Sequence, residues 1–282
     1  MPKFGALAYL WIREWNDETG VYALRHTAAA NLDLIEIPMP NPGIFNAVLA
    51  KRQLAEYGIE GVCSLVLPPY AHLPAAPERA LAFLKLVLEK VDALGATYLG
   101  GVLYASVGTM TLKSPTQQER DQCVQVLGEV AADAARRGIT LGIEPVNRYE
   151  TYVYNSIADT LALIEAIGAS NITLHVDTYH MNIEERGFFE PIRQAGQRLS
   201  YVHASESDRG LVGMGNVHWD DFFAGLATIN YRGPIVLESF ATVVPSMVAA
   251  TCLWRPSPYN PQQLVDEGVA FLREKAAQVG LL

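Results

Sequence analysis

Residues 139–155 read ITLGIEPVNRYETYVYN. The stretch begins with Ile139–Ile143, a short apolar run that has the length and residue types of a buried strand. The run stops at Glu144, and polar side chains continue to Glu150 before helix-forming sequence resumes near Ser156. A buried strand that ends in clustered polar side chains and leads into a helix is typical of barrels of alternating strands and helices, in which the chemistry lies at the carboxyl ends of the strands.

Three later stretches repeat this arrangement. They read ITLHVDTYH (172–180), LSYVHASESDR (199–209) and GPIVLESF (233–240), and in each an apolar run stops on Asp, His or Glu. Over the whole chain, strand-like runs are predicted to end near Ile12, Pro38, Leu67, Leu103, Glu144, Asp177, His203 and Glu238. Amphipathic helical stretches are predicted at about 18–30, 44–57, 77–94, 115–137, 155–168, 185–196, 219–229 and 260–279.

Strands and helices that alternate about every 30 residues predict a fold of the α/β class, one (β/α)8 TIM barrel over residues 1–282. A doubly wound open sheet is the alternative, but it would normally carry a glycine-rich first turn, and the turn at 11–15 (WIREW) has no GxGxxG pattern. Residues 241–258 form a long connection before the last helix. We interpret this connection as a lid over the barrel mouth or as part of a subunit contact.

The composition excludes several classes of protein. Basic residues are scattered and the net charge is −9, which argues against a nucleic-acid partner. The three cysteines (Cys63, Cys123 and Cys252) form no CxxC pair, and the N-terminus shows no signal-peptide pattern, so a cytoplasmic location is expected. The apolar run 241–254 is interrupted by Pro245 and is shorter than the roughly 20 residues that a membrane span requires, so no membrane partner is expected.

Four possible metal ligands stand at the ends of the last four predicted strands: Glu144, Asp177, His203 and Glu238. Because the strand ends converge around the barrel axis, their side chains can share one ion. Three carboxylates and one imidazole suit a divalent ion such as Mn²⁺, Co²⁺ or Mg²⁺, and suit a thiolate zinc site poorly. Each residue alone has an ordinary alternative, a helix cap for the acids or a hydrogen-bonded core position for His203. Four successive strands that end on ligand types favour a metal centre.

A second polar residue follows three of these ligands at short spacing. Glu150 follows Glu144, His180 follows Asp177, and Arg209 follows His203. A sugar-like ligand needs such a second set, because each of its hydroxyls must be paired once it leaves water. The ordinary alternatives are a surface ion pair for Arg209, a helix-start hydrogen bond for His180 and a solvated carboxylate for Glu150.

These motifs together resemble the ketose 3-epimerases, the D-tagatose, D-psicose (allulose) and L-ribulose 3-epimerase group of the xylose-isomerase-like TIM barrels. The resemblance covers nearly the whole chain. It is carried by EPVNRYE (144–150), VDTYHMNIEE (176–185), HASESDR (203–209), Glu238-Ser-Phe, NVHWDDFF (216–223) and Leu253-Trp254-Arg255.

The resemblance implies roles for individual residues. Glu144, Asp177, His203 and Glu238 would hold one Mn²⁺ or Co²⁺ ion per subunit, with Mg²⁺ as an alternative, and Glu150, His180 and Arg209 would contact the O1–O3 end of an open-chain ketose. Glu36, in IEIP at the end of the second strand, would orient a ligand or cap the strand. Barrels of this group commonly assemble, so a homodimer or homotetramer is expected.

The predicted reaction is epimerisation of free, non-phosphorylated ketoses at C3. A metal ion polarises the ketone, and inversion needs one acid–base group on each side of the enediolate. Glu144 and Glu238, which come from different sides of the barrel mouth, are the predicted pair. A phosphosugar is disfavoured because Gly210, Gly213 and Gly215 have no lysine nearby.

Three other functions remain open from the residues alone. An aldose–ketose isomerase of the hydroxypyruvate or inosose isomerase type would share the metal and the glutamates, but its proton would move between C1 and C2. A metal-dependent nuclease of related fold is opposed by the charge and by a histidine count of only six. A barrel that binds sugars without catalysis would not need the complete set of polar residues.

Overall fold

The computed structural model describes residues 1–241 and 253–282. Eight parallel strands form a closed barrel in the order β1 to β8, and β1 pairs with β8. The predicted TIM barrel is therefore confirmed. The strands are β1 (Phe4–Leu7), β2 (Leu34–Pro38), β3 (Glu60–Val66), β4 (Tyr98–Val102), β5 (Thr140–Ile143), β6 (Ile172–Asp177), β7 (Leu199–Ala204) and β8 (Ile235–Leu237).

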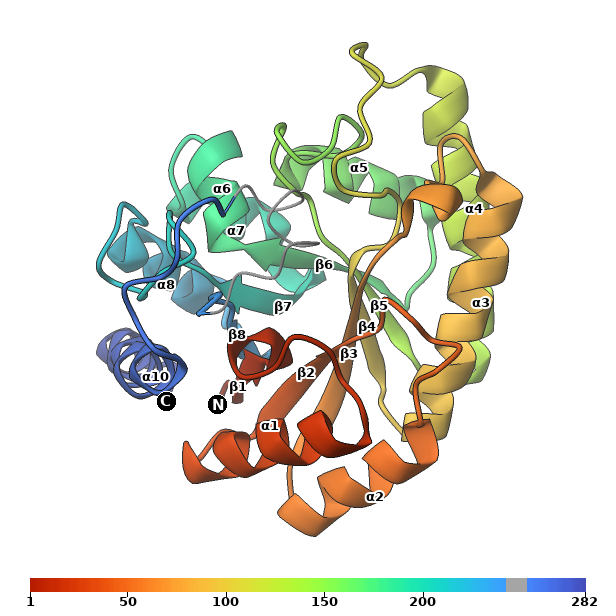
Figure 1. The fold of residues 1–282 in the computed structure, drawn as a ribbon. Coiled ribbons are helices and arrows are strands. Elements are labelled where there is room, and N and C mark those ends of the chain that lie inside the picture. Colours follow the sequence, from red (N-terminus) through yellow and green to blue (C-terminus); the bar gives the residue numbers. More distant parts are fainter. Residues whose placement is uncertain (242–252) are drawn as a thin grey trace.

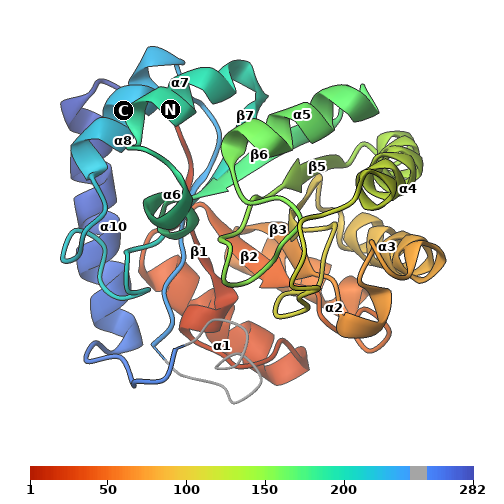
Figure 2. The ribbon, with the colours of Figure 1, turned by 90° about the horizontal axis from the view of Figure 1, so that it is seen from above.

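Helices surround this barrel and cover the outer faces of the strands (Figure 1). They are α1 (Asp17–Ala29), α2 (Ala47–Tyr57), α3 (Pro77–Leu94), α4 (Gln117–Arg136), α5 (Ile157–Ile167), α6 (Thr178–Glu184), α7 (Phe189–Ala195), α8 (Trp219–Thr228) and α10 (Pro261–Gln278). Seen from above, most helices form a ring, and α6 lies inside that ring (Figure 2). The two chain ends lie near one another in both views.

Local chemistry sets where several helices begin and end. Thr116 caps α4 by accepting a hydrogen bond from the Glu119 backbone, and the Glu119 side chain accepts one from the Thr116 backbone in return. Gly95 ends α3 in the left-handed conformation, with a φ of 82°, which glycine adopts without a steric penalty.

Two predicted boundaries were wrong. The first strand ends at Leu7 rather than near Ile12, because Ala8–Leu10 turns into a short 3-10 helix that is also largely buried and therefore extends the apolar run. The predicted helix at 185–196 is preceded by a separate helix, α6. Asp177 ends β6 and also caps α6 by accepting a hydrogen bond from the Tyr179 backbone, so no loop separates the two elements.

Two tyrosines fill the inside of the barrel below its carboxyl end. The rings of Tyr98 on β4 and Tyr201 on β7 stack with centroids 4.5 Å apart. Gly142 on β5 makes the room: a Cβ there would lie 1.8 Å from the Tyr98 hydroxyl oxygen. The interior is therefore packed, and a cavity can open only above this layer.

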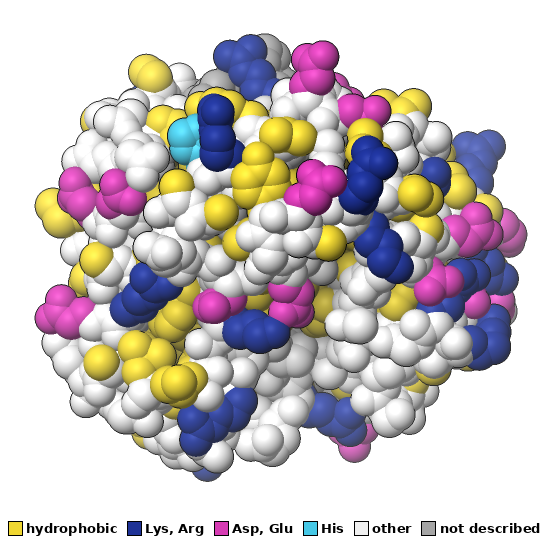
Figure 3. Space-filling model, turned by 90° about the horizontal axis from the view of Figure 1, so that it is seen from below, with side chains coloured by type: hydrophobic (Ala, Val, Ile, Leu, Met, Phe, Trp, Pro, Cys, Tyr) yellow, Lys and Arg dark blue, Asp and Glu magenta, His cyan; other side chains and the backbone are white. Residues whose placement is uncertain are grey.

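Surface chemistry agrees with the composition. On the face shown in Figure 3, acidic and basic side chains alternate, without a large region of one charge. Cys63 and Cys123 are buried, as expected for core cysteines. In the parts of the chain that the structure describes, no helix is long and apolar enough to cross a bilayer. The predicted lid or interface at 241–258, which includes Cys252, falls largely on residues 242–252, outside the described ranges.

Candidate active site

The four predicted metal ligands converge at the carboxyl end of the barrel. Glu144 follows β5, Asp177 ends β6, His203 lies in β7 and Glu238 follows β8, and all four side chains are buried. Nδ1 of His203 lies 3.5 Å from Oε1 of Glu144 and 3.7 Å from Oε2 of Glu238. Ligand atoms of Asp177, His203 and Glu238 all lie within 4.8 Å of one another. The fold thus brings together side chains that span almost a hundred residues of sequence.

His203 presents an unpaired nitrogen to these carboxylates. Its Nε2 lies 2.6 Å from Oε2 of Glu36, whereas its Nδ1 has no hydrogen-bond partner within the described ranges. Burial disfavours the imidazolium, but the charges of Glu36 and Glu238 outweigh burial and raise the pKa of His203 well above its ordinary value. An orphaned, buried nitrogen that faces carboxylates fits a divalent metal ion.

Arg209 lies over two of the carboxylates. Its Nη1 donates to Oδ2 of Asp177 at 2.8 Å and to Oε2 of Glu238, and Nη2 approaches Nε2 of His180 at 3.4 Å. The guanidinium also stacks on the Tyr179 ring, with 4.0 Å between its carbon and the ring centroid. Arg209 is buried and does not form the surface ion pair considered from the sequence. Although burial opposes its charge, the nearby carboxylates, Glu238 first, raise the pKa of Arg209.

The backbone of Arg209 has a φ of 61°, which is uncommon for a residue with a side chain. Glu206 holds this loop in place, because its buried carboxylate accepts hydrogen bonds from the backbones of Gly213 and Val217 and from the Trp219 indole. Such strain is typical of functional sites, where the surroundings impose a conformation.

Asn147 joins the other two predicted substrate contacts, a role that the sequence did not reveal. Its backbone N–H and its side-chain amide both donate to Nδ1 of His180, at 3.1 Å and 2.9 Å, and the same amide donates to Oε1 of Glu150 at 2.9 Å. His180 therefore carries its proton on Nε2, the nitrogen that faces Arg209 and the carboxylates. Burial and the charge of Arg209 lower the pKa of His180, so the ring is neutral.

The acidic groups titrate differently because their surroundings differ. Burial raises the pKa of Glu144 and, more strongly, that of Asp177. Burial also opposes the charge of Glu238, but Arg209 and His203 outweigh it and lower the pKa of that group. For Glu150, burial raises the pKa to about 7 in spite of Arg209. The pKa values of neighbouring carboxyl groups are therefore shifted in opposite directions.

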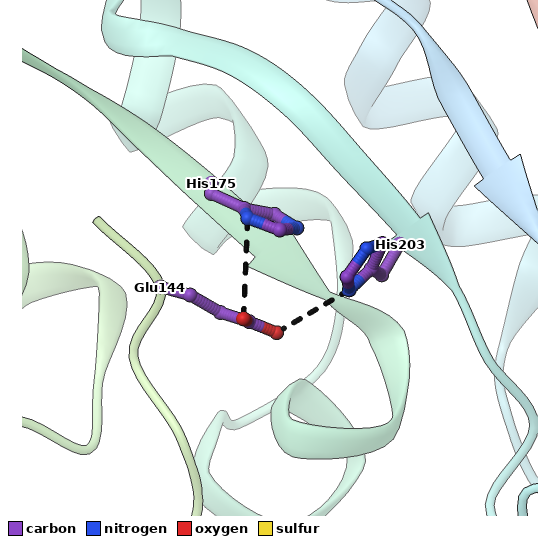
Figure 4. Close-up of side chains that lie close together, drawn as sticks. All are labelled: Glu144, His175 and His203. Atoms are coloured by element: carbon purple, nitrogen blue, oxygen red, sulfur yellow. Dashed lines mark ion pairs between the residues drawn. The ribbon is translucent and has the colours of Figure 1, made fainter. Parts of the chain in front are cut away.

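His175 is a further residue that we did not predict. It lies two positions before Asp177 on β6, so both side chains point into the barrel, and this alternation was the available signal. Its Nδ1 is 3.9 Å from Oε2 of Glu144, and its ring packs edge-on against His203 with centroids 4.2 Å apart. Figure 4 shows the Glu144 carboxylate facing both imidazoles, with a dashed line to each. His175 thus packs against two of the predicted metal ligands, Glu144 and His203.

These side chains open into a cavity of about 600 Å³ at the barrel mouth. Its polar lining includes Glu36, Glu144, Glu150, His180, His203, Arg209 and Glu238. Apolar lining comes from the end of β1, from β3 and from the loop after β2, including Leu7, Leu65 and Met39, and the loops after β1 and β2 add Arg13 and Asn41. A small polar molecule with an apolar or mixed far end would fit this division.

A closed α/β barrel with carboxylates, imidazoles and an arginine around one cavity at its carboxyl end has the architecture of a TIM-barrel enzyme. The chain belongs to the xylose isomerase-like TIM barrel family, whose model matches residues 24–275. It is 35% identical to an L-ribulose 3-epimerase of Methylomonas sp. (strain DH-1) over 97% of each chain. It is 34% identical to a ketose 3-epimerase of Arthrobacter globiformis over 98% of each chain.

A solved structure agrees with these relatives. The D-allulose 3-epimerase from Methylomonas sp. in complex with D-allulose superposes with a TM-score of 0.93, at 34% identity over 97% of each chain. The resemblance to ketose 3-epimerases that the motifs indicated is confirmed.

Proposed function

We propose that this protein is a metal-dependent ketose 3-epimerase that acts on free ketoses. The observation that carries the proposal is the placement of Glu144 and Glu238 close to Nδ1 of His203, at 3.5 Å and 3.7 Å, in the lining of one cavity. The similarity to proteins named L-ribulose, ketose and D-psicose 3-epimerases supports it.

Glu144, Asp177, His203 and Glu238 would hold one divalent ion, with Mn²⁺ or Co²⁺ expected and Mg²⁺ as an alternative. When bound, the ion would polarise the ketone and stabilise negative charge on the neighbouring oxygens. The donor set is consistent with all three ions, so competition titrations on the metal-free protein decide the preference.

The reaction requires two carboxyl groups in opposite protonation states. One glutamate removes the proton from C3, which leaves an enediolate, and the other, protonated, returns a proton to C3 on the opposite face. After turnover the first carboxyl carries the proton that the second has lost, so proton exchange restores the starting state. Glu144 comes from β5 and Glu238 from β8, and this origin from distant strands gives access to both faces.

Three further side chains would bind and orient the sugar. Glu150, His180 and Arg209 line the cavity beside the acid–base pair and would pair with the hydroxyl and carbonyl oxygens of the O1–O3 end. Asn147 fixes the first two of these residues. Because all three side chains are buried, a ketose that reaches them must present hydroxyls that pair with them.

The test is NMR of sugars recovered from D₂O after incubation with metal-stripped protein reloaded with Mn²⁺ or Co²⁺. The panel comprises D-fructose, D-tagatose, D-psicose and L-ribulose. Deuterium at C3 together with the C3 epimer is expected. Label at C1 with an aldose product would instead establish the isomerase alternative, and a failure to label any ketose in spite of bound metal would contradict the proposal.

Variants test the assigned roles. Glu144→Gln and Glu238→Gln should each lower turnover by at least about 10²-fold, the usual contribution of a general acid or base. Glu190→Gln, on the exposed end of α7, is the matched control and should leave turnover unchanged. Near-normal activity in either active-site variant would disprove the acid–base assignment. We also expect a homodimer or homotetramer, which light scattering after gel filtration would detect.

A further inference from the structure

Glu36 is a buried carboxylate without a cationic side chain of Lys or Arg beside it in the described ranges. It lies in β2, and 1% of its surface is exposed. Its Oε2 accepts from the Tyr201 hydroxyl at 2.7 Å and lies 2.6 Å from Nε2 of His203. Burying a carboxylate is unfavourable unless it is paired, and the ionisable group within hydrogen-bond distance of Glu36 is the His203 ring.

The contact with His203 determines which ring nitrogen is available. A carboxylate only accepts hydrogen bonds, so Nε2 of His203 carries the proton that it donates to Glu36. In the neutral ring that a metal ligand requires, Nδ1, on the other side of the ring, is then the nitrogen that offers a lone pair on the side of Glu144 and Glu238. A histidine without such a partner would divide between two tautomers, and only one of them can ligate through Nδ1.

Neighbouring aromatic rings also fix the orientation of the His203 imidazole. The His203 ring packs edge-on against His175, at 4.2 Å between centroids, and against Tyr201, at 5.7 Å. Tyr201 therefore contacts both members of the Glu36–His203 pair, once through its ring and once through its hydroxyl. Rotation of the imidazole would break the hydrogen bond to Glu36 and disturb both ring contacts.

We propose that Glu36 is a positioning residue of the metal centre, which keeps the proton on Nε2 of His203 and orients Nδ1 toward the ion. Glu36 also lines the cavity, but in this role it acts through His203. The inference rests on the metal centre of the proposed function and adds to it a residue outside the four ligands. Partners of this kind typically change metal affinity by about 10–100-fold when they are removed.

The first experiment measures Mn²⁺ and Co²⁺ affinity by calorimetry on metal-stripped protein. Glu36→Leu, which cannot accept a hydrogen bond, should bind each ion about 10–100-fold more weakly than the wild type. Tyr201→Phe is the matched control, because it removes the other hydrogen bond to the same oxygen and leaves the Glu36–His203 contact. It should bind within about threefold of the wild type. Equal affinity in Glu36→Leu and the wild type would overturn the role of Glu36.

The second experiment observes the proton directly in the wild type. In ¹⁵N-histidine-labelled wild type, the His203 ring should show a slowly exchanging proton on Nε2, both metal-free and loaded with diamagnetic Mg²⁺ or Zn²⁺. His203→Gln assigns the signal. In Glu36→Gln, which keeps the side-chain volume, the signal should shift or lose its protection from exchange. An unprotonated Nε2 in the wild type would overturn the inference.

The two proposals fail in different ways. If the wild type binds neither Mn²⁺ nor Co²⁺, the metal centre itself is wrong. If the wild type binds an ion and Glu36→Leu binds it equally well, the metal centre stands and only the role of Glu36 is wrong. If Tyr201→Phe weakens binding as much as Glu36→Leu, general disruption of the barrel interior replaces the positioning role.

Discussion

Replacing Arg209 with methionine tests how the site balances its buried charges. In the metal-free protein, Nη1 of Arg209 donates to both Asp177 and Glu238, and all three side chains are buried. Methionine retains a long apolar side chain but removes the positive charge. The two carboxylates would then face each other without the cation that now lies between them.

The expected loss is large because the pair is buried. Removing one partner of a buried ion pair lowers the free energy of unfolding by about 3–5 kcal/mol. For a protein of this size, each kcal/mol corresponds to about 2–4 °C in the unfolding midpoint, so Arg209→Met should unfold about 6–20 °C lower at pH 8. Lower pH should reduce the loss, because burial already raises the pKa of Asp177 and a protonated acid no longer needs the cation.

Calorimetric unfolding of the metal-free wild type and variant measures this difference. Arg193→Met, in the exposed pair with Glu190 on α7, is the control and should leave the midpoint unchanged. Saturating Mn²⁺ should raise the midpoint of Arg209→Met more than that of the wild type, since the ion supplies the missing positive charge. A variant as stable as the wild type without metal, or a smaller gain from Mn²⁺, would refute the reasoning.

Two further predictions follow from the same region. The pKa of the Glu150 carboxyl is about 7 in the folded protein and near 4.5 in the unfolded chain. As the pH rises, the unfolded chain therefore loses the carboxyl proton before the folded protein does. The free energy of unfolding of the wild type should fall by up to about 3 kcal/mol between pH 4.5 and 7. The side chain that Glu150→Gln introduces cannot ionise, so the stability of this variant relative to the wild type should rise from pH 5 to pH 8. Urea unfolding at both pH values measures the difference in the free energy of unfolding. A difference that stays constant with pH would contradict the role of Glu150. Gly142→Ala should lower stability by about 1–3 kcal/mol through overlap with the Tyr98 hydroxyl. Thermal unfolding of the double variant with Tyr98→Leu should show less than the summed loss, and full additivity would exclude the clash.

The fold and the convergence of the four candidate metal ligands followed from the sequence for one reason. In a parallel barrel every strand ends at the same rim, so a ligand type at the end of each of four successive strands must lie near the others. Local patterns were enough to find Glu144, Asp177, His203 and Glu238, because each directly follows or ends an apolar run. The same reasoning missed helix α6. Asp177 both ends β6 and caps α6, so no loop marks where the helix begins.

The partners of these residues depended on contacts across the barrel. Glu36 and His203 are 167 positions apart on strands that are not neighbours in the sheet, so no local pattern links them. Arg209 could have formed a surface pair with the acids beside it in sequence, but its loop turns the guanidinium inward onto Asp177 and Glu238. Periodicity tells which side chains point into the barrel. Only the closed structure decides which of them meet, because strand stagger and side-chain volume set the distances across the interior.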